Sequence, residues 1–244
     1  MNESTRPVTA IVAARGNSRG IVRKNLQDLG GKPLVVHSLE AARAAKSVDD
    51  IFVTTDDDEI AGVCESFGFP APYRRPAALA ADKASMLDVV LDALAHLEKA
   101  GRGCGIFVLL QPTSPLRSHR HIDEAVALFR RSGAELLTSV HEVREHPFDC
   151  VALAGRHQAA GRRDWKLMMR PDAKRGNRQS YKSGFHYING ALYLGTPQAL
   201  RRHGAFVVEG ETVLYAMDQL DGIDIDTPND LELARALMEY RQRG

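Results

Sequence analysis

The stretch VTAIVAARGNSRGIVRKN (residues 8–25) decides the fold class of this chain. Its first part, Val8 to Ala14, is a short apolar run without regular polar alternation. Such a run predicts a strand covered on both faces, as in the parallel sheets of α/β proteins. Its second part is a loop with two glycines, three arginines and one lysine. This loop suits a backbone that approaches a phosphate, but it also suits an exposed basic turn.

Similar apolar runs and amphipathic stretches alternate through the rest of the chain. Further strands are expected at Ile51 to Thr55, Ile106 to Leu110, Leu136 to Val140 and Ile188 to Leu194. Helical spacing predicts helices over Leu87 to Leu97, Ile122 to Phe129 and Leu231 to Met238, and a helix from Pro33 to about Ala45 with the proline in its first turn. This alternation predicts an α/β fold with a doubly wound, mostly parallel sheet.

The length of 244 residues suits a single domain, 1–244, with one insertion at about 141–187. Within the insertion, the segment from Arg156 to Lys182 holds nine basic and two acidic residues, a local net charge of +7. Apolar periodicity is weak there, although Trp165 to Met169 forms a mostly apolar patch. Such a segment is a lid, a dimerisation arm or a solvated loop.

Composition and charge narrow the classes of partner and compartment. The net charge of +1 is small for a protein whose main partner is duplex nucleic acid, so no nucleic acid is expected. The apolar runs are too short to cross a bilayer and the first seven residues show no signal peptide, so no membrane is expected. The three cysteines form no CxxC pair, which predicts reduced thiols and a cytoplasmic protein.

Polar clusters follow two further apolar runs, where ligands bind in open parallel sheets. Gln111 to Arg117 (QPTSPLR) follows the run that ends at Leu110, and its prolines stiffen a turn that presents polar groups and the fork of Arg117. The same segment also suits a turn before a helix capped by Ser118. The acidic run Asp56 to Asp58 follows the second strand and is expected to be a solvated strand end and helix start.

A pair of aspartates lies near the C-terminus, in DIDTPND from Asp224 to Asp230. On a strand, Asp224 and Asp226 would point to the same face. Two such carboxylates repel each other unless a cation lies between them, and Mg²⁺ accepts one or two carboxylates together with phosphate oxygens. Helix capping by Asp226 or Thr227 explains the rest of the segment but leaves Asp224 unexplained.

These segments, taken together, resemble the motifs of the acylneuraminate cytidylyltransferases, the family that makes CMP-sialic acids and related CMP-nonulosonates. The opening motif of that family is matched by residues 14–20, 23–25 and 30–34, its second motif by residues 74–76, 79–80, 82 and 85, and its QPTSPLR segment by residues 111–117. Its last two motifs are matched by residues 189–193 and 224–228. The five matches follow the family's order and span nearly the whole chain.

The resemblance implies a Rossmann-like nucleotidyltransferase fold, a homodimer with a dimerisation arm, and transfer of CMP from CTP to the anomeric hydroxyl of a nine-carbon 2-keto acid sugar. Pyrophosphate is released and Mg²⁺ is the implied cofactor. The implied roles are triphosphate binding by Arg15, Ser18, Arg19 and Lys24; cytidine binding by Asn25, Arg75 and Ser85; sugar binding by Gln111, Thr113, Ser114, Tyr193, Arg178 and Gln179; and Mg²⁺ binding by Asp224 and Asp226. Among these, the catalytic set is Arg15, Lys24, Gln111, Asp224 and Asp226.

The resemblance leaves the sugar and the nucleotide open. This chain has Ala14 and Arg19 where the family often has proline and lysine, and Asp149 where some sialic acid enzymes have a lysine. N-acetylneuraminate, legionaminate and pseudaminate are all candidate substrates. One alternative is the same fold acting on GTP or on the eight-carbon sugar acid Kdo, although the Arg23–Asn25 stretch fits the sialic acid branch better. A nucleic-acid or partner-binding module built on the basic arm leaves the two aspartates and the QPTSPLR turn unexplained.

Overall fold

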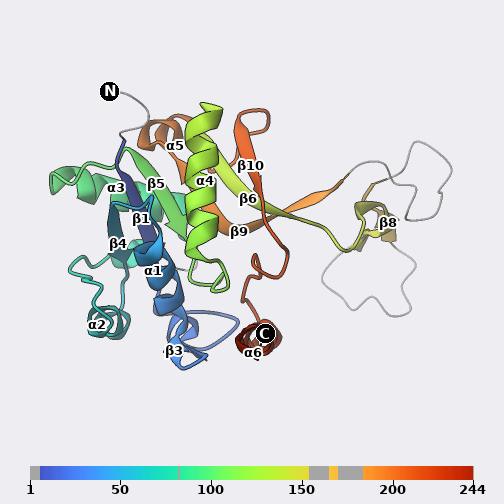
Figure 1. Ribbon diagram of the computed structural model, residues 1–244, viewed down its shortest axis with the longest axis horizontal. Coiled ribbons are helices and arrows are strands. Elements are labelled where there is room, and N and C mark those ends of the chain that lie inside the picture. Colours follow the sequence, from blue (N-terminus) through green and yellow to red (C-terminus); the bar gives the residue numbers. More distant parts are fainter. Residues whose placement is uncertain (1–5, 82, 154–164, 170–183, 244) are drawn as a thin grey trace.

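A six-stranded sheet forms the centre of the computed structural model, which describes residues 6–81, 83–153, 165–169 and 184–243 (Figure 1). In their order across the sheet, the strands are β10 (Thr212–Ala216), β6 (Leu136–Glu142), β9 (His186–Gly195), β5 (Ile106–Leu110), β1 (Val8–Ala13) and β4 (Asp50–Thr54). Strand β1 pairs in parallel with β4 and β5, and β6 pairs in parallel with β10. Strand β9 is antiparallel to both of its neighbours, so the sheet is mostly parallel, as predicted.

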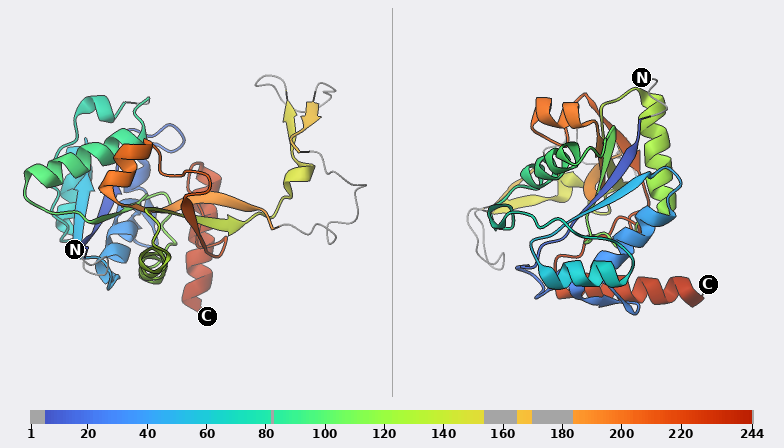
Figure 2. Two further views of the ribbon diagram at one scale, coloured as in Figure 1. Left: turned by 90° about the horizontal axis from the view of Figure 1, so that it is seen from above. Right: turned by 90° about the vertical axis from the view of Figure 1, so that its left-hand side faces the viewer.

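Helices cover both faces of this sheet (Figures 1 and 2). One face carries α1 (Leu34–Ala44), α2 (Asp58–Ser66) and α4 (His119–Ser132), and the other carries α3 (Met86–Lys99) and α5 (Pro197–His203). Val108 contacts the first layer and Leu109 the second, and both are fully buried. Burial on both faces is the physical reason why the central strands lack polar alternation.

A third apolar cluster lies below the carboxyl end of the sheet and belongs to the C-terminal helix α6 (Pro228–Arg243). This helix packs on the loop after β1 and on the short hairpin of β2 (Asp28–Leu29) and β3 (Lys32–Pro33). Ile225, just before α6, is fully buried in the same cluster as Leu29. The segment that holds the two aspartates is therefore anchored beside the basic loop.

Strands β6 and β9 continue past the body as a two-stranded stalk, which carries a small separate sheet (Figures 1 and 2). That sheet pairs β7 (Val151–Leu153) with β8 (Trp165–Leu167), and the short helix η4 (Pro147–Asp149) precedes it. Trp165 and Met168 are 52% and 61% exposed. The pairing of β6 with β9 shifts register between Thr138 and Val140, and that bulge lies where the stalk meets the body.

The structure confirms the five predicted strands and the four predicted helices and differs from the sequence analysis in detail. Pro33 is the residue before α1 rather than part of its first turn, because its ψ of 142° is extended. Strand β10 and helix α5 were not expected. No helix in the described part of the chain is long and apolar enough to cross a membrane.

Candidate active site

A cleft of about 380 Å³ opens at the carboxyl ends of β1 and β5. The strand order reverses between these two strands, because β4 lies on one side of β1 and the later strands lie beyond β5. Open α/β sheets bind ligands at such a point. Nine of the residues predicted from the sequence line the cleft: Arg15, Ser18, Lys24, Asn25, Arg75, Gln111, Thr113, Asp224 and Asp226.

The basic loop after β1 forms one wall of the cleft. Lys24 begins the short helix η2 (Lys24–Leu26), and its Nζ donates hydrogen bonds to Ile225 O at 2.8 Å and to Asp226 Oδ1 at 2.9 Å. Asn25 is buried, and its Nδ2 donates to Arg15 O at 2.9 Å. A side chain at Gly20 would collide with the carbonyl oxygen of Asp226. Loop and acidic segment therefore touch through their backbones, and Lys24 bridges them.

The QPTSPLR turn forms the opposite wall and is held by its last residue. Arg117 is 2% exposed and does not reach the cleft, so the expectation of a fork presented to ligand is wrong. Its Nη1 donates to the carbonyl oxygens of Gln111, Ser114 and Ala191 at 3.4, 3.1 and 3.3 Å, and its Nη2 donates to Ser38 Oγ at 2.7 Å. Burial lowers the pKa of this guanidinium to about 9, so it is still charged at neutral pH. The turn is thus built around a buried cation.

Two polar residues of this turn, Gln111 and Thr113, line the cleft and are hydrogen-bonded to neighbouring segments. Gln111 Nε2 donates to Gly190 O at 3.3 Å, which links the turn to β9. Thr113 O accepts a hydrogen bond from Ile225 N at 2.8 Å, and the Thr113 side chain hydrogen-bonds to Asp224. The turn therefore also fixes the acidic segment.

Asp224 and Asp226 both line the cleft but do not lie on a strand, so that expectation is wrong. They flank the buried Ile225 in an irregular segment before α6, and both residues line the same cleft. Shielding from water raises the pKa of the Asp224 carboxyl, the Thr113 hydrogen bond opposes that rise, and the negative charge of Asp226 adds to it. Their mutual repulsion favours a cation at this position.

The donor set of this acidic pair fits Mg²⁺, a hard cation that prefers oxygen ligands. Within residues 6–81, 83–153, 165–169 and 184–243, no group of three or more His, Cys, Asp or Glu is arranged to hold a metal. Mg²⁺ is usually bound by one or two carboxylates and completed by phosphate oxygens and water. Two carboxylates opposite a basic loop match that pattern. The fit is therefore to a metal that arrives with a phosphorylated ligand.

Of the predicted site residues that the structure describes, four do not line the cleft. Ser85 is the N-cap of α3, Ser114 is buried behind the turn, Tyr193 packs against Phe206 with ring centroids 5.1 Å apart, and Arg19 lies at the outer lip beside Asn17. Burial, and then the charge of Asp224, raise the pKa of Tyr193, which places that ring near the acidic pair. Arg178 and Gln179 lie outside the described residues.

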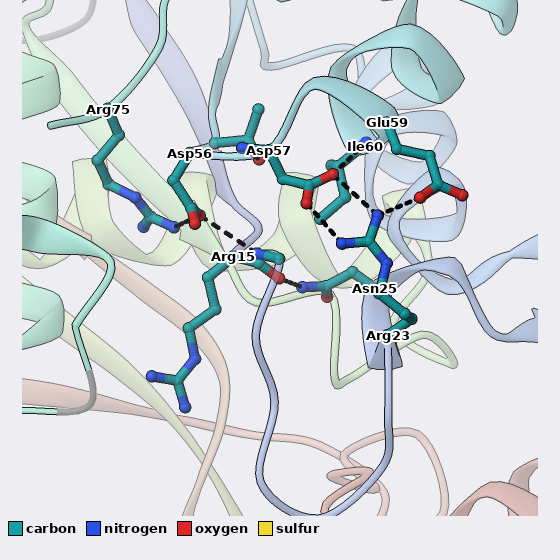
Figure 3. A network of polar contacts seen from close by, with 10 residues as sticks. Arg15, Arg23, Asn25, Asp56, Asp57, Glu59, Ile60 and Arg75 are labelled. Atoms are coloured by element: carbon teal, nitrogen blue, oxygen red, sulfur yellow. Dashed lines mark hydrogen bonds and ion pairs between the residues drawn. The ribbon is translucent and has the colours of Figure 1, made fainter. Parts of the chain in front are cut away.

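A network that the sequence analysis did not anticipate braces the basic loop from behind (Figure 3). Asp56 and Asp57 follow β4, and their side chains are only 20% and 19% exposed, so the expectation of a solvated strand end is wrong for these two. Asp56 pairs with Arg75 at 3.0 Å, and Asp57 pairs with Arg23 at 2.5 Å. Three acidic residues after a strand could have signalled partners among the nearby arginines.

Comparison with known proteins places these features in a family. The sequence model of the family described as Cytidylyltransferase matches residues 9–240. The chain is 28% identical to CMP-N,N'-diacetyllegionaminic acid synthase of Legionella pneumophila, over 97% of this chain and 98% of that protein. It is 31% identical to N-acylneuraminate cytidylyltransferase of Streptococcus agalactiae, over 90% of this chain and 50% of that protein. The chain thus spans about half of the streptococcal relative.

A solved structure shares the fold at lower sequence identity. The structure of CMP:2-keto-3-deoxy-manno-octonic acid synthetase complexed with CTP superposes with a TM-score of 0.71 and 20% identity. The match covers 96% of this chain and 99% of that one. The mixed sheet with its single antiparallel strand is therefore a known arrangement.

Proposed function

This chain belongs to the cytidylyltransferase family, and from that premise we propose that it transfers CMP from CTP to the anomeric hydroxyl of a nonulosonic acid. The two curated relatives named above act, by their names, on sugars of that class. The observation that carries the proposal is the cleft itself. It sets Lys24 and the basic loop against Asp224 and Asp226, with the QPTSPLR turn on the other side.

The reaction requires little covalent chemistry from the protein. The anomeric oxygen forms a bond to the α-phosphorus of CTP, and the bond from that phosphorus to the bridging oxygen of the β-phosphate breaks. Pyrophosphate leaves, and the hydroxyl proton passes to solvent. Catalysis of such a displacement rests on positioning and on neutralising charge.

Each wall of the cleft has a task in this scheme. Arg15 and Lys24, with Arg19 at the lip, neutralise the triphosphate, and Ser18 lies among them. Gln111 is placed to orient the sugar hydroxyl, because its amide already lies at the junction of the turn and β9. Mg²⁺ bound by Asp224 and Asp226 would supply further positive charge to the phosphates.

The second element of the proposal is the arm, which consists of the stalk of β6 and β9 and the small sheet of β7 and β8. The apolar side chains exposed on it, Val151, Trp165 and Met168, form a surface that a second copy of the chain would cover, giving a homodimer. Arg178 would then contact the sugar carboxylate. Sedimentation should show about twice the chain mass, and Arg178→Ala should raise the KM for sugar far more than the KM for CTP. A monomer with full activity would overturn the dimer.

A pyrophosphate-release screen tests the reaction. The purified chain is incubated with Mg²⁺, each of CTP, GTP, ATP and UTP, and each of N-acetylneuraminate, legionaminate, pseudaminate and Kdo. Release only with CTP and a nine-carbon sugar acid supports the proposal and names the sugar. Release with GTP, or with Kdo alone, would replace this reaction by another of the same fold. No release from any pair would overturn it.

A further inference from the structure

We propose that Arg23 and Asp57 are positioning residues, which hold the basic loop in the shape that turns Lys24 into the cleft. The inference rests on the proposed function, because it concerns how that cleft receives a nucleotide triphosphate. It assigns Arg23 to the support of the loop rather than to the phosphate, although it lies beside Lys24 in the sequence.

The contacts of Arg23 are the first support. Its guanidinium takes Asp57 in a two-pronged pair, with Nη1 to Oδ2 at 2.5 Å and Nη2 to Oδ1 at 3.0 Å. Its Nη2 also donates to Glu59 Oε2 at 2.5 Å. Hydrogen bonding to Arg23 lowers the pKa of Asp57 below its ordinary value. Both Nη atoms already donate to carboxylates, and Arg23, Asp57 and Glu59 together carry a net negative charge, which disfavours a phosphate at this guanidinium.

The backbone at Arg23 is the second support. Within the described residues, Arg23 is the one non-glycine residue with positive φ, at 51°. Left-handed backbone disfavours a side chain with a Cβ, so the local conformation needs support from elsewhere. The two-pronged pair with Asp57 supplies it. The same turn sends the next residue in the opposite direction, because Lys24 contacts Ile225 and Asp226 while Arg23 contacts the start of α2.

The beginning of the loop is tied to the same strand end. Gly16 N donates to Asp56 Oδ1 at 3.2 Å, and a Cβ at Gly16 would lie 2.5 Å from Asp57 Oδ2. Figure 3 shows the Arg15 side chain pointing away from Asp56 and Asp57, whereas the Arg23 guanidinium points toward Asp57. Asp56 and Asp57 thus bind the two ends of the loop, at Gly16 and at Arg23, while Ser18 between them lines the cleft.

Four single variants and one double variant separate the ion pair from the backbone. Arg23→Gln removes the pair and keeps the strained backbone, whereas Arg23→Gly removes the pair and relieves the strain. Asp57→Asn keeps the cap of α2, because asparagine caps helices as well as aspartate does, and loses the charge that holds Arg23. Asp58→Asn is the matched control, since Asp58 is the next residue and pairs with Arg74 at 2.7 Å, away from the loop. Arg23→Gln combined with Asp57→Asn closes the cycle.

The measurement is the dissociation constant for CTP by calorimetry in the absence of sugar, together with the KM values for CTP and sugar. Arg23→Gln and Asp57→Asn should each weaken CTP binding about tenfold and leave the KM for sugar unchanged. Arg23→Gly should weaken it only about threefold, and the double variant should be no worse than about twofold beyond Arg23→Gln. Asp58→Asn should bind as the wild type does. Melting temperatures establish that each variant is folded.

The comparison of CTP affinity between Arg23→Gln and Arg23→Gly is the sharpest test, because loss of the positive charge alone predicts equal weakening in both variants. Unchanged CTP binding in a folded Arg23→Gln variant would overturn the inference, as would Arg23→Gly binding more weakly than Arg23→Gln. A double variant about a hundredfold weaker than the wild type would also overturn it. If the wild type itself fails to bind CTP, the proposed function is wrong, and the inference falls with it.

Discussion

Arg23 and Arg117 each fix one wall of the cleft, but the two guanidinium groups lie in opposite surroundings. Arg23 is partly exposed and faces the carboxylates of Asp57 and Glu59. Arg117 is buried, and the partners that hold it are three carbonyl oxygens and one hydroxyl. One wall is therefore held by formal charges that solvent and ions can reach, and the other by dipoles sealed in the core. Salt and pH should therefore affect the wall that Arg23 holds more than the wall that Arg117 holds.

The largest effect should come from the wall that Arg117 holds, and it should be a loss of stability. Arg117→Met would remove the charged donor to Ala191 O on β9 and to Ser114 O, which would keep only the 3.5 Å hydrogen bond from the backbone N of residue 117. Buried groups left unpaired cost roughly 1–3 kcal/mol each, so the free energy of unfolding should fall by about 3 kcal/mol or more. Urea denaturation measures it. Arg201→Met, which removes an exposed pair with Glu98, is the control and should cost less than about 1 kcal/mol. Equal losses in the two variants would erase the distinction between the walls.

The next effect concerns the acidic segment that both walls contact. Asp226→Asn keeps the shape of the side chain and removes the charge that pairs with Lys24. Turnover at saturating Mg²⁺ should fall by about 100-fold or more, mainly in kcat, because a metal ligand acts in the transition state. Steady-state kinetics over a Mg²⁺ titration measures it. Near-normal kcat would show that the carboxylate holds no catalytic metal.

A smaller effect should come from the contact between loop and acidic segment. Gly20→Ala places a Cβ against the carbonyl oxygen of Asp226, and one of the two backbones must shift. We expect kcat/KM for CTP to fall by about tenfold. Gly103→Ala is the control, because a Cβ there meets nothing within 4 Å. If Gly20→Ala matches this control, the charged wall tolerates displacement and the walls differ less than described.

The smallest effect is in the pH dependence of the charged wall. The pKa of Asp57 is held below its ordinary value of 3.8, first by the hydrogen bond from Arg23. A carboxylate with a lowered folded pKa stabilises the fold above its unfolded pKa, and that contribution is lost as pH falls through the folded value. Between about pH 5 and about pH 3, the melting temperature of the wild type should therefore fall by a few degrees more than that of Asp57→Asn. If the melting temperatures of the wild type and Asp57→Asn fall in parallel with pH, the ion pair between Arg23 and Asp57 adds no stability.

The fold was largely predictable because its signals are local. Ile106 to Leu110 is apolar at every position since the strand is buried on both faces, and the helices show one apolar stripe each. Strand β10 was missed because it is a half-exposed edge strand, and its buried Tyr215 donates a hydrogen bond to Glu124, which is far away in the sequence. Edge strands owe their order to partners that a local pattern does not contain.

The sequence predicted which residues line the cleft better than it predicted what each residue does there. The motifs placed Lys24, Gln111 and Asp226 at one cleft because Lys24 and Gln111 come after buried strands and Asp226 precedes helix α6. The tasks of Arg23 and Arg117 could not be predicted, since both look like free cations beside a ligand loop. What decides them is the position of Asp57, 34 residues from Arg23, and the absence of any carboxylate among the hydrogen-bond partners described for Arg117.

Strand β9 also connects the stalk to the cleft. It runs from the stalk, where His186 pairs with Glu142, to the core, where Leu194 pairs with Val108. The bulge with Gly190 at φ 73° interrupts this pairing. Gly190, whose carbonyl accepts the hydrogen bond from Gln111, thus lies between the stalk and the core. The strand that carries the stalk is therefore also the strand that holds the Gln111 side chain of the cleft.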